Sequence, residues 1–334
     1  MRFALTAALL AVAVSACAPP AARVERPGAA ARLPDTLRVQ VREGSTLLVR
    51  RVPFEEYVQV TILSEFAPAA GEAAVVARMY DLQAVISRTY AAAHPRRHAQ
   101  DGFDLCSTTH CQVFEPARLR TSRWAGAARD AVSRTAGLVV WFGQAPATAL
   151  FHADCGGRTS DATTVWGGAA PSYLRGVTDD GPAVSAHATW RYEAGREAVR
   201  AALNAHPPTA VGARLVAIEV VQRDQARRIQ RLRLKGEYER IVRGEDFRTA
   251  LTRAFGARSV RSTRFDIRAL GDTLVLEGHG FGHGVGLCQA GAFARVRAGE
   301  PLRDILQRYY PGTTLRTAPC SRAPPTPSSR RRQG

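Results

Sequence analysis

The feature that most constrains this chain is a run of glycines at every second position, from Gly278 to Gly286. This spacing removes side chains from one edge of the backbone, so that a bulky group can lie directly against the main chain. His279 and His283 are held beside that edge. The stretch lacks the Gly-Lys-Ser/Thr ending and the glycine spacing of nucleotide-binding motifs. We expect a close backbone approach here; a loop with incidental histidines is the alternative.

The N-terminus predicts export. Met1-Arg2 precedes an apolar run over residues 3–14, and small residues follow, immediately before Cys17. The run is too short for a membrane span and is typical of a secretory signal. The pattern resembles a bacterial lipobox, so we expect residues 1–16 to be a lipoprotein signal peptide; an ordinary signal peptide is the alternative. Residues 17–35 would then be the lipidated cysteine and a flexible tether, with the protein facing the periplasm or the cell wall.

The formal charge of +17 indicates acidic partners. An exported protein meets cell-wall carboxylates and anionic lipid headgroups, so we expect contact with those and with no nucleic acid. Lys235 is the only lysine, and this arginine bias is also typical of GC-rich coding, which weakens the inference from charge alone. Residues 319–334, with their Pro/Ser-rich stretch and terminal arginines, are expected to form a disordered basic tail.

Helical and strand patterns mix without strict alternation, which predicts an α+β fold. We expect residues 36–318 to form one large domain with room for two lobes. Alternating residues predict a strand pair within 37–50, with a turn at Glu43-Gly44. Hairpins are predicted from 138–142 with 147–153 and from 215–222 with 228–234, and a further strand at 274–277. A first helix is predicted to begin at Pro53 and to be stopped by Pro68 and Gly71. Further helices are predicted at 72–94, 122–134, 245–255, 287–298 and 302–309.

Glu65 is the first candidate for chemistry. The apolar residues from Phe54 to Ile62 recur at helical spacing, and Glu65 continues their stripe. A carboxyl group on an apolar face has its charged form disfavoured, so its pKa rises and it can donate a proton near neutral pH. The alternative is a partly exposed glutamate in an ion pair, with Arg78 or Arg88 as the partner.

A second candidate is a cluster of cysteines and histidines in an irregular segment. Setting Cys17 aside leaves an odd number of cysteines for an oxidising compartment. Two thiolates and two imidazoles are suitable ligands for one structural zinc ion, although the spacing is not that of a zinc finger. A disulfide within the cluster is the alternative. The expected ligands are His98, Cys106, His110 and Cys111.

A third candidate is the turn that follows the strand at 147–153. It presents an imidazole, a thiol and backbone N–H groups from His152, Cys155, Gly156, Gly157 and Thr159. Cys155 could act as a nucleophile with His152 as its base. A disulfide between Cys155 and Cys288 is favoured over that reading in an oxidising compartment, where it would join two glycine-rich turns.

Taken together, these segments resemble the SpoIID/LytB family, named for a stage II sporulation protein and a modifier of a cell-wall amidase. The resemblance covers residues 50–315. Its motifs are Glu56-Tyr57-Val58 leading to Glu65, Gln83-Ala84-Val85 with Arg88-Thr89-Tyr90, Phe151-His152 with Gly156-Gly157-Arg158-Thr159, Val165-Trp166-Gly167, Gly282-His283-Gly284 with Gln289-Ala290-Gly291, and Tyr309-Tyr310-Pro311-Gly312.

The resemblance implies a peptidoglycan lytic transglycosylase that cleaves glycan strands, preferably strands stripped of stem peptides. Glu65 matches the family's catalytic glutamate. Most glycoside hydrolases need two carboxylates, whereas a transglycosylase uses the sugar's own C6 hydroxyl and forms a 1,6-anhydromuramoyl end. One group can then serve as acid and as base. The residues expected to position sugar or stabilise charge are Gln83, Arg88, His152, Gly156, Gly157, Thr159, His283, Gly284 and Gln289.

The family also implies zinc near Cys106 and Cys111 in some members. This chain departs from the pattern at Cys288, where serine is common, and at Leu82, which precedes Gln83 in place of a lysine-containing sequence. The leading alternative function is a non-catalytic glycan binder that activates a cell-wall amidase. A third is a hydrolase built on Cys155 and His152.

Overall fold

A computed structural model describes residues 32–68, 71–180 and 188–318. The predicted signal peptide, Cys17, most of the tether and the basic tail lie outside these residues. Helices mix with small, mainly antiparallel sheets, which confirms the α+β prediction. Within the described residues, no helix combines the length and apolar character needed to cross a bilayer.

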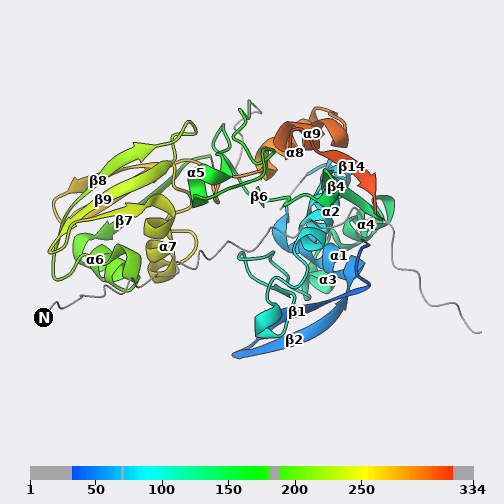
Figure 1. Cartoon of the computed structure of the whole chain (residues 1–334), viewed down its shortest axis with the longest axis horizontal. Helices are drawn as coiled ribbons and strands as arrows, with labels where there is room; N and C mark the ends of the chain where they lie inside the picture. The colour runs from blue at the N-terminus through cyan, green and yellow to red at the C-terminus, as the bar shows by residue number, and fades with distance from the viewer. Residues whose placement is uncertain (1–31, 69–70, 181–187, 319–334) are drawn as a thin grey trace, which may run out of the picture.

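The chain forms two lobes (Figure 1). The main lobe is built from residues 32–180 and 279–318, and the second lobe from residues 188–278. The second lobe has its own apolar core, centred on Phe247, Leu232 and Leu276. The main lobe has two apolar clusters, one on each side of a central helix. The second lobe is therefore inserted between an N-terminal and a C-terminal segment of the main lobe.

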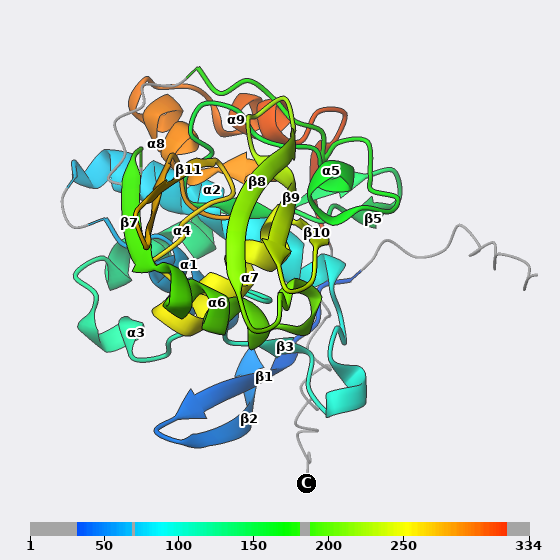
Figure 2. The ribbon, with the colours of Figure 1, turned by 90° about the vertical axis from the view of Figure 1, so that its left-hand side faces the viewer.

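The main lobe begins with a hairpin of β1 (Thr36–Glu43) and β2 (Thr46–Pro53), as the alternation predicted. The hairpin protrudes from the lobe, which Figures 1 and 2 show from two sides. Short strand β3 (Leu105–Cys106) lies parallel to β1 and anchors the loop with the Cys/His cluster. The 3-10 turn η1 (Ala99–Asp101) lies in the same loop.

Helix α1 (Phe54–Glu65) follows directly from β2 and ends at the candidate acid. Helix α2 (Ala73–Ala93) contributes Val76 and Tyr80 to one apolar cluster and Met79 and Val85 to the other. Such a helix is buried on opposite faces, so it is the axis on which the main lobe packs. Both helices match their predicted ranges closely.

The prediction over residues 138–153 was partly wrong. Strand β4 (Leu138–Phe142) pairs with the very short β5 (Ala145–Pro146) and with β14 (Thr314–Thr317). Residues 151–152 form β6 (Phe151–His152), which instead pairs in parallel with β13 (Leu287–Cys288). The remaining helices of this lobe are α3 (Arg118–Thr121), α4 (Ala125–Arg134), α5 (Ala162–Trp166), α8 (Gln289–Arg297) and α9 (Leu302–Tyr309).

The second lobe has two three-stranded sheets, in the orders β10-β9-β8 and β11-β12-β7. Figure 2 shows this lobe in front, with β8 and β9 facing the viewer. The hairpin of β8 and β9, helix α7 and strand β12 were predicted; β7, α6, β10 and β11 were not. The elements are β7 (Trp190–Gly195), α6 (Arg196–Asn204), η2 (Pro207–Thr209), β8 (Leu215–Arg223), β9 (Ile229–Gly236), β10 (Arg240–Arg243), α7 (Gly244–Phe255), β11 (Phe265–Leu270) and β12 (Thr273–Gly278).

Candidate active site

Glu65 is the last residue of α1 and is half-buried. Its Oε1 accepts a hydrogen bond from the backbone N–H of Val113. The pKa of the Glu65 carboxyl is raised to about 7: burial raises it most, the hydrogen bond from the Val113 N–H opposes this, and the negative charge of Glu115 adds to it. The negative end of the helix dipole acts in the same direction as burial. Glu65 is therefore a group that can donate a proton near neutral pH.

The backbone at Val113 is held firmly by its two neighbours. Tyr57 donates its hydroxyl hydrogen to Oε1 of Gln112 at 3.1 Å, and both side chains are buried. The Phe114 ring stacks on Tyr57 with 5.2 Å between the centroids. The N–H that faces Glu65 is consequently fixed by packing on both sides.

The structure does not support the alternative in which Glu65 forms an ion pair with Arg78 or Arg88. Arg88 pairs with Glu55 at 2.7 Å, and Arg78 donates to the carbonyl oxygen of Val296. In the part of the chain that the structure describes, Glu65 makes no ion pair. Its carboxyl group is therefore not neutralised by a permanent cation, in agreement with its raised pKa.

Arg88 was expected to bind substrate, and its position corrects that expectation. Its side chain is fully buried, and besides Glu55 it donates to the carbonyl oxygens of Leu138 at 3.3 Å and Val132 at 3.4 Å. A guanidinium with no exposed surface cannot contact a glycan. Arg88 instead joins α2 to α1 and α4.

Gln83 and Gln289 lie next to Glu65, but both are buried. Nε2 of Gln289 donates to the backbone oxygen of Glu65 at 3.3 Å and to Oε1 of Gln83 at 3.1 Å. Nε2 of Gln83 in turn donates to Ser87 at 3.2 Å. These amides tie the end of α1 to α2 and α8, so they position Glu65 rather than facing substrate.

The glycine-rich segment makes the predicted close approach, but the group that approaches is the protein itself. A Cβ on Gly280, Gly284 or Gly286 would come closer than 3.0 Å to Asp154, Arg228 and Leu150 respectively. The backbones of Asp154 and Phe281 also exchange hydrogen bonds of 2.8 and 3.0 Å. Gly284 is thus a packing position and not a substrate contact, which corrects that expectation.

The polar groups of the turn after β6 likewise form hydrogen bonds within the protein. The N–H of Gly156 donates to Oδ1 of Asp154 at 2.7 Å, and the N–H of Gly157 donates to Sγ of Cys155 at 3.2 Å. Oγ1 of the buried Thr159 accepts from the N–H of Val177 at 2.8 Å. These groups stabilise the turn, so the expected donation of N–H groups to substrate is not available here.

His152 and His283 lie side by side, with 5.5 Å between ring centroids. His152 is buried, and its Nδ1 bonds the carbonyl oxygen of Val285 at 3.1 Å. Burial, together with the charges of Arg228 and Arg248, lowers the pKa of His283 to about 3. His283 is therefore neutral. The His283 ring also contacts the exposed side chain of Trp166. In the sequence, only the family motif Val165-Trp166-Gly167 pointed to this tryptophan.

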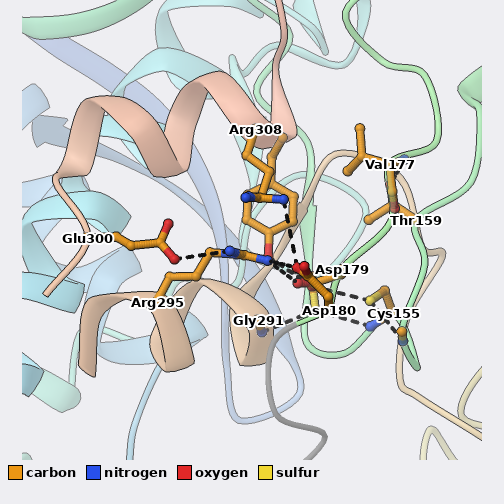
Figure 3. A network of polar contacts seen from close by, with 12 residues as sticks. Cys155, Thr159, Val177, Asp179, Asp180, Gly291, Arg295, Glu300 and Arg308 are labelled. Carbon is orange, nitrogen blue, oxygen red and sulfur yellow. Dashed lines mark hydrogen bonds and ion pairs between the residues drawn. The ribbon is translucent and has the colours of Figure 1, made fainter. Parts of the chain in front are cut away.

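Cys155 and Cys288 are both free, which corrects the expected disulfide. The Cys155 thiol donates to Oδ2 of Asp179 at 3.4 Å, and Sγ of Cys288 accepts from the N–H groups of Cys155 and Gly291. Figure 3 shows Cys155 beside Asp179. Asp179 also accepts a hydrogen bond from the Tyr309 hydroxyl at 2.8 Å. Cys155 makes no hydrogen bond to His152 among the described residues, so the geometry does not support the nucleophile reading.

The predicted zinc ligands His98, Cys106, His110 and Cys111 are brought together, and their ligand atoms lie within 4.8 Å of one another. Nε2 of His98 is 3.4 Å from Sγ of Cys111, and Nδ1 of His110 is 3.8 Å from both sulfurs. The edges of a tetrahedral zinc site with two sulfurs and two nitrogens are about 3.5 Å, so the residues fit such an ion. Both cysteines are free, without the alternative disulfide.

Comparison with known proteins matches the two lobes separately. A family profile described as stage II sporulation protein (SpoIID) matches residues 42–142, and a domain of unknown function (DUF8618) matches residues 185–286. Stage II sporulation protein D of Bacillus subtilis (strain 168) is 26% identical over 284 residues, which cover 81% of this chain and 76% of that protein.

Two further relatives extend this comparison. An uncharacterized protein of Brachyspira hyodysenteriae is 28% identical over 275 residues, covering 80% of this chain and 68% of the relative. The amidase enhancer of B. subtilis is 43% identical over 60 residues, only 18% of this chain and 8% of that protein. The likeness to the sporulation protein therefore extends through both lobes, and the likeness to the amidase enhancer is local.

Proposed function

This chain belongs to the SpoIID family, which is associated with cell-wall lytic activity, and on that premise we propose that it is a peptidoglycan lytic transglycosylase. Its substrate is the glycan strand, preferably stripped of stem peptides, and its product carries a 1,6-anhydromuramoyl end. The observation that carries the proposal is the Glu65 carboxyl, whose pKa is raised to about 7 at the end of α1. A protonated carboxyl at neutral pH is what protonation of a leaving glycosidic oxygen requires.

The two oxygens of Glu65 have different surroundings. Oε1 accepts the Val113 N–H, which leaves Oε2 to carry the proton. In the first half of the reaction Oε2 gives its proton to the glycosidic oxygen as the bond to the sugar breaks. The carboxylate then takes the proton of the C6 hydroxyl as that oxygen bonds to the same carbon. The Val113 N–H stabilises the carboxylate formed between the two transfers.

The environment of the neighbouring acid Glu115 also argues against a hydrolase. Hydrolytic glycosidases use a pair of carboxyl groups about 5–10 Å apart. The acidic residue whose charge raises the pKa of Glu65 is Glu115, but Glu115 is exposed and pairs with Arg118 at 2.8 Å. An exposed carboxylate in an ion pair is not suited to act as the nucleophile or the base. An internal nucleophile, the sugar's own hydroxyl, makes a second carboxylate unnecessary.

His283 and Trp166 are the residues we propose to contact sugar away from the reacting bond. The Trp166 side chain is 42% exposed, and its ring lies 5.2 Å from that of His283. An exposed indole offers an apolar face to a sugar ring, and the neutral His283 ring lies beside it, with its Nδ1 held by the N–H of Val285 at 3.0 Å. The formal charge of +17 favours strands that carry muramic carboxylates.

We also propose that His98, Cys106, His110 and Cys111 hold one structural zinc ion. The ion would fix the loop that begins at β3 and leads, two residues after Cys111, to the N–H that faces Glu65. The neighbouring Cys111 lowers the pKa of Cys106, and Cys106 raises that of Cys111, so the two thiols ionise in sequence and a bound metal ion would replace the second proton. Removal of the ion by a chelator should lower the melting temperature. An unchanged melting temperature in a protein that contains no zinc would contradict this part of the proposal.

A second candidate function is activation of a cell-wall amidase. It is favoured by the local similarity to the amidase enhancer, and it does not require Glu65 to be protonated. Export and anchoring by a lipid on Cys17 remain part of the proposal in either case, since both functions act on the wall.

The experiment is mass spectrometry of purified, peptide-free glycan strands after incubation with residues 18–334. Wild type should release anhydro-ended fragments, and Glu65→Gln should reduce the rate by at least about 100-fold, the usual range for general acid–base groups. Glu115→Gln is the matched control and should retain cleavage. Intact strands with the wild type, together with stimulation of an amidase that Glu65→Gln preserves, would shift the assignment to the second candidate.

A further inference from the structure

A second cluster of possible metal ligands lies in the main lobe, away from the loop with His98. A ring nitrogen of His152 and the sulfurs of Cys155 and Cys288 lie within 4.8 Å of one another. All three side chains are at least nine-tenths buried. They come from β6, from the turn that follows it and from β13, which pairs with β6 through Cys288 and His152.

His152 is held in the manner of a metal ligand. Its Nδ1 lies 3.1 Å from the carbonyl oxygen of Val285, which can only accept, so Nδ1 carries the hydrogen. Nε2 then keeps a lone pair, yet this nitrogen is buried and has no hydrogen-bond partner. An unpaired buried nitrogen is costly, whereas metal-bound histidines usually donate their other N–H to a carbonyl in this way.

The two sulfurs are surrounded by backbone donors. The N–H of Gly157 is 3.2 Å from Sγ of Cys155, and Sγ of Cys288 accepts from Cys155 at 3.2 Å and from Gly291 at 3.4 Å. Cys288 is also the N-cap of α8, a helix of nine residues. The sulfur of Cys288 thus faces two backbone N–H groups at a helix N-terminus, and the sulfur of Cys155 faces one.

The surrounding charge indicates which ion fits. Arg228 is fully buried, makes no ion pair among the described residues, and donates to the carbonyl oxygen of Cys155 at 3.4 Å. The negative charges of Glu245 and Asp224 act on this guanidinium, and a negative charge at the sulfurs would add to them. A monovalent ion held by two thiolates leaves one net negative charge beside Arg228, whereas a divalent ion would leave none.

The number of ligands points the same way. A structural zinc site requires four ligands. Asp179, whose Oδ2 is 3.4 Å from Sγ of Cys155, is the nearest candidate for a fourth, but it already bonds Tyr309 and pairs with Arg295, as Figure 3 shows. A trigonal set of two thiolates and one imidazole suits a soft monovalent ion such as Cu(I).

We propose that His152, Cys155 and Cys288 form a buried trigonal binding site for one Cu(I) ion. Binding displaces the two thiol protons to solvent and leaves a complex with one net negative charge beside Arg228. The site does not depend on the proposed transglycosylase activity, since Glu65 takes no part in it. It also differs from the loop with His98, which offers four ligands and is partly exposed.

The test compares Cu(I) capacity in wild type and in Cys288→Ser, using the reduced full chain under anaerobic conditions and a competing chromophoric Cu(I) chelator. Serine is close to cysteine in size and its oxygen can replace the sulfur as the cap of α8, so this variant should fold, which circular dichroism would verify. We expect it to bind one Cu(I) ion fewer per chain. Ions bound by Cys17, Cys320 or the His98 loop contribute equally to the Cu(I) capacity of both proteins, so they do not affect the difference between them. Cys106→Ser is the control, and its capacity should fall only at the loop.

Two results would overturn the proposal. One is equal Cu(I) capacity in wild type and Cys288→Ser. The other is a Cys155–Cys288 disulfide in protein isolated from an oxidising compartment without reductant, detected by alkylation and peptide mass mapping. Loss of the sulfur-to-copper absorption in Cys155→Ser as well as in Cys288→Ser would support both ligands independently. Failure of glycan cleavage in the same samples would bear on Glu65 and not on this site.

Discussion

Two regions of this molecule carry the residues that looked most functional in the sequence, and they differ in how their polar groups are used. At the end of α1, Glu65 is half-buried with one backbone donor and no ion pair among the described residues. In the glycine-rich segment 278–286, Gly280, Gly284 and Gly286 each face an atom of the protein itself. A group with unmet hydrogen-bonding capacity can react, whereas a segment whose space is filled serves the architecture.

Burial acts in opposite directions on the two regions' titratable groups. It raises the pKa of Glu65 to about 7 and lowers that of His283 to about 3. Both shifts have one cause, since a site of low polarity disfavours any charged form. The result is a carboxyl group that holds a proton it can give away and an imidazole that remains uncharged. The predictions below test this contrast, beginning with the largest expected effect.

Gly286→Ala should destabilise the protein by at least about 4 kcal/mol, because its Cβ would collide with the backbone at Leu150 and its φ is +70°. Gly299→Ala is the matched control: its φ is +86°, but no atom lies within 4 Å, so about 1–2 kcal/mol is expected. Urea denaturation measures both. Similar losses would mean that the close approach in the glycine-rich segment contributes little.

Arg88→Met should lower the unfolding free energy by about 3 kcal/mol, since it breaks a pair in which the guanidinium is fully buried. Arg134→Met removes an exposed pair with Asp81 and should cost less than about 1 kcal/mol. Cleavage per folded molecule should be unchanged in both. If Arg88→Met retained wild-type stability but bound glycan poorly, the result would support a substrate-binding role for Arg88.

The stability of the wild type should fall as the pH rises from about 4.5 to about 7. In this window the folded state retains the Glu65 proton that the unfolded state has released, so a higher pH favours unfolding. Since one pKa unit corresponds to about 1.4 kcal/mol, the effect is at most about 3.5 kcal/mol. Glu65→Gln should lack it, being more stable than wild type at pH 8 and equal at pH 4. Parallel curves from thermal melts across this range would refute the raised pKa.

The smallest effect is expected from Glu115→Gln. The negative charge of Glu115 raises the pKa of Glu65, so its removal should lower that pKa. The alkaline limb of the pH–rate profile should then move to lower pH by a fraction of a unit, with little change in the maximal rate. Glu197→Gln, in an exposed pair with Arg200 in the second lobe, should leave the profile unmoved. A shift to higher pH in Glu115→Gln would contradict the assignment of that limb to Glu65.

Local patterns predicted much of the fold. The hairpin of β1 and β2, helices α1, α2, α7 and α9 and the hairpin of β8 and β9 all lie where periodicity put them. Strand β6 was misplaced because its partner is β13, more than a hundred residues away, and no local signal specifies such a pairing. The strands β7 and β11 were missed for the same reason, since each is completed by β12.

The candidate site divides in the same way. Helical spacing alone placed Glu65 on an apolar stripe, and residue chemistry alone selected His98, Cys106, His110 and Cys111. The substrate roles given to Arg88, Gln83 and Thr159 came from motifs, and a motif does not state whether a side chain is exposed. Asp179 and Arg228 had no local signal, because their partners come from distant segments.

The sequence by itself determined the α+β class, the acidic group at the end of a helix and the set of four metal-type ligands, because each depends on spacing or side-chain chemistry within a short segment. Only the tertiary structure decided that the glycines admit the protein's own backbone, that Arg88 is buried with Glu55, and that Cys155 and Cys288 are free beside His152. Those outcomes depend on which distant segments come together, and burial and hydrogen-bond satisfaction exist only once they have done so.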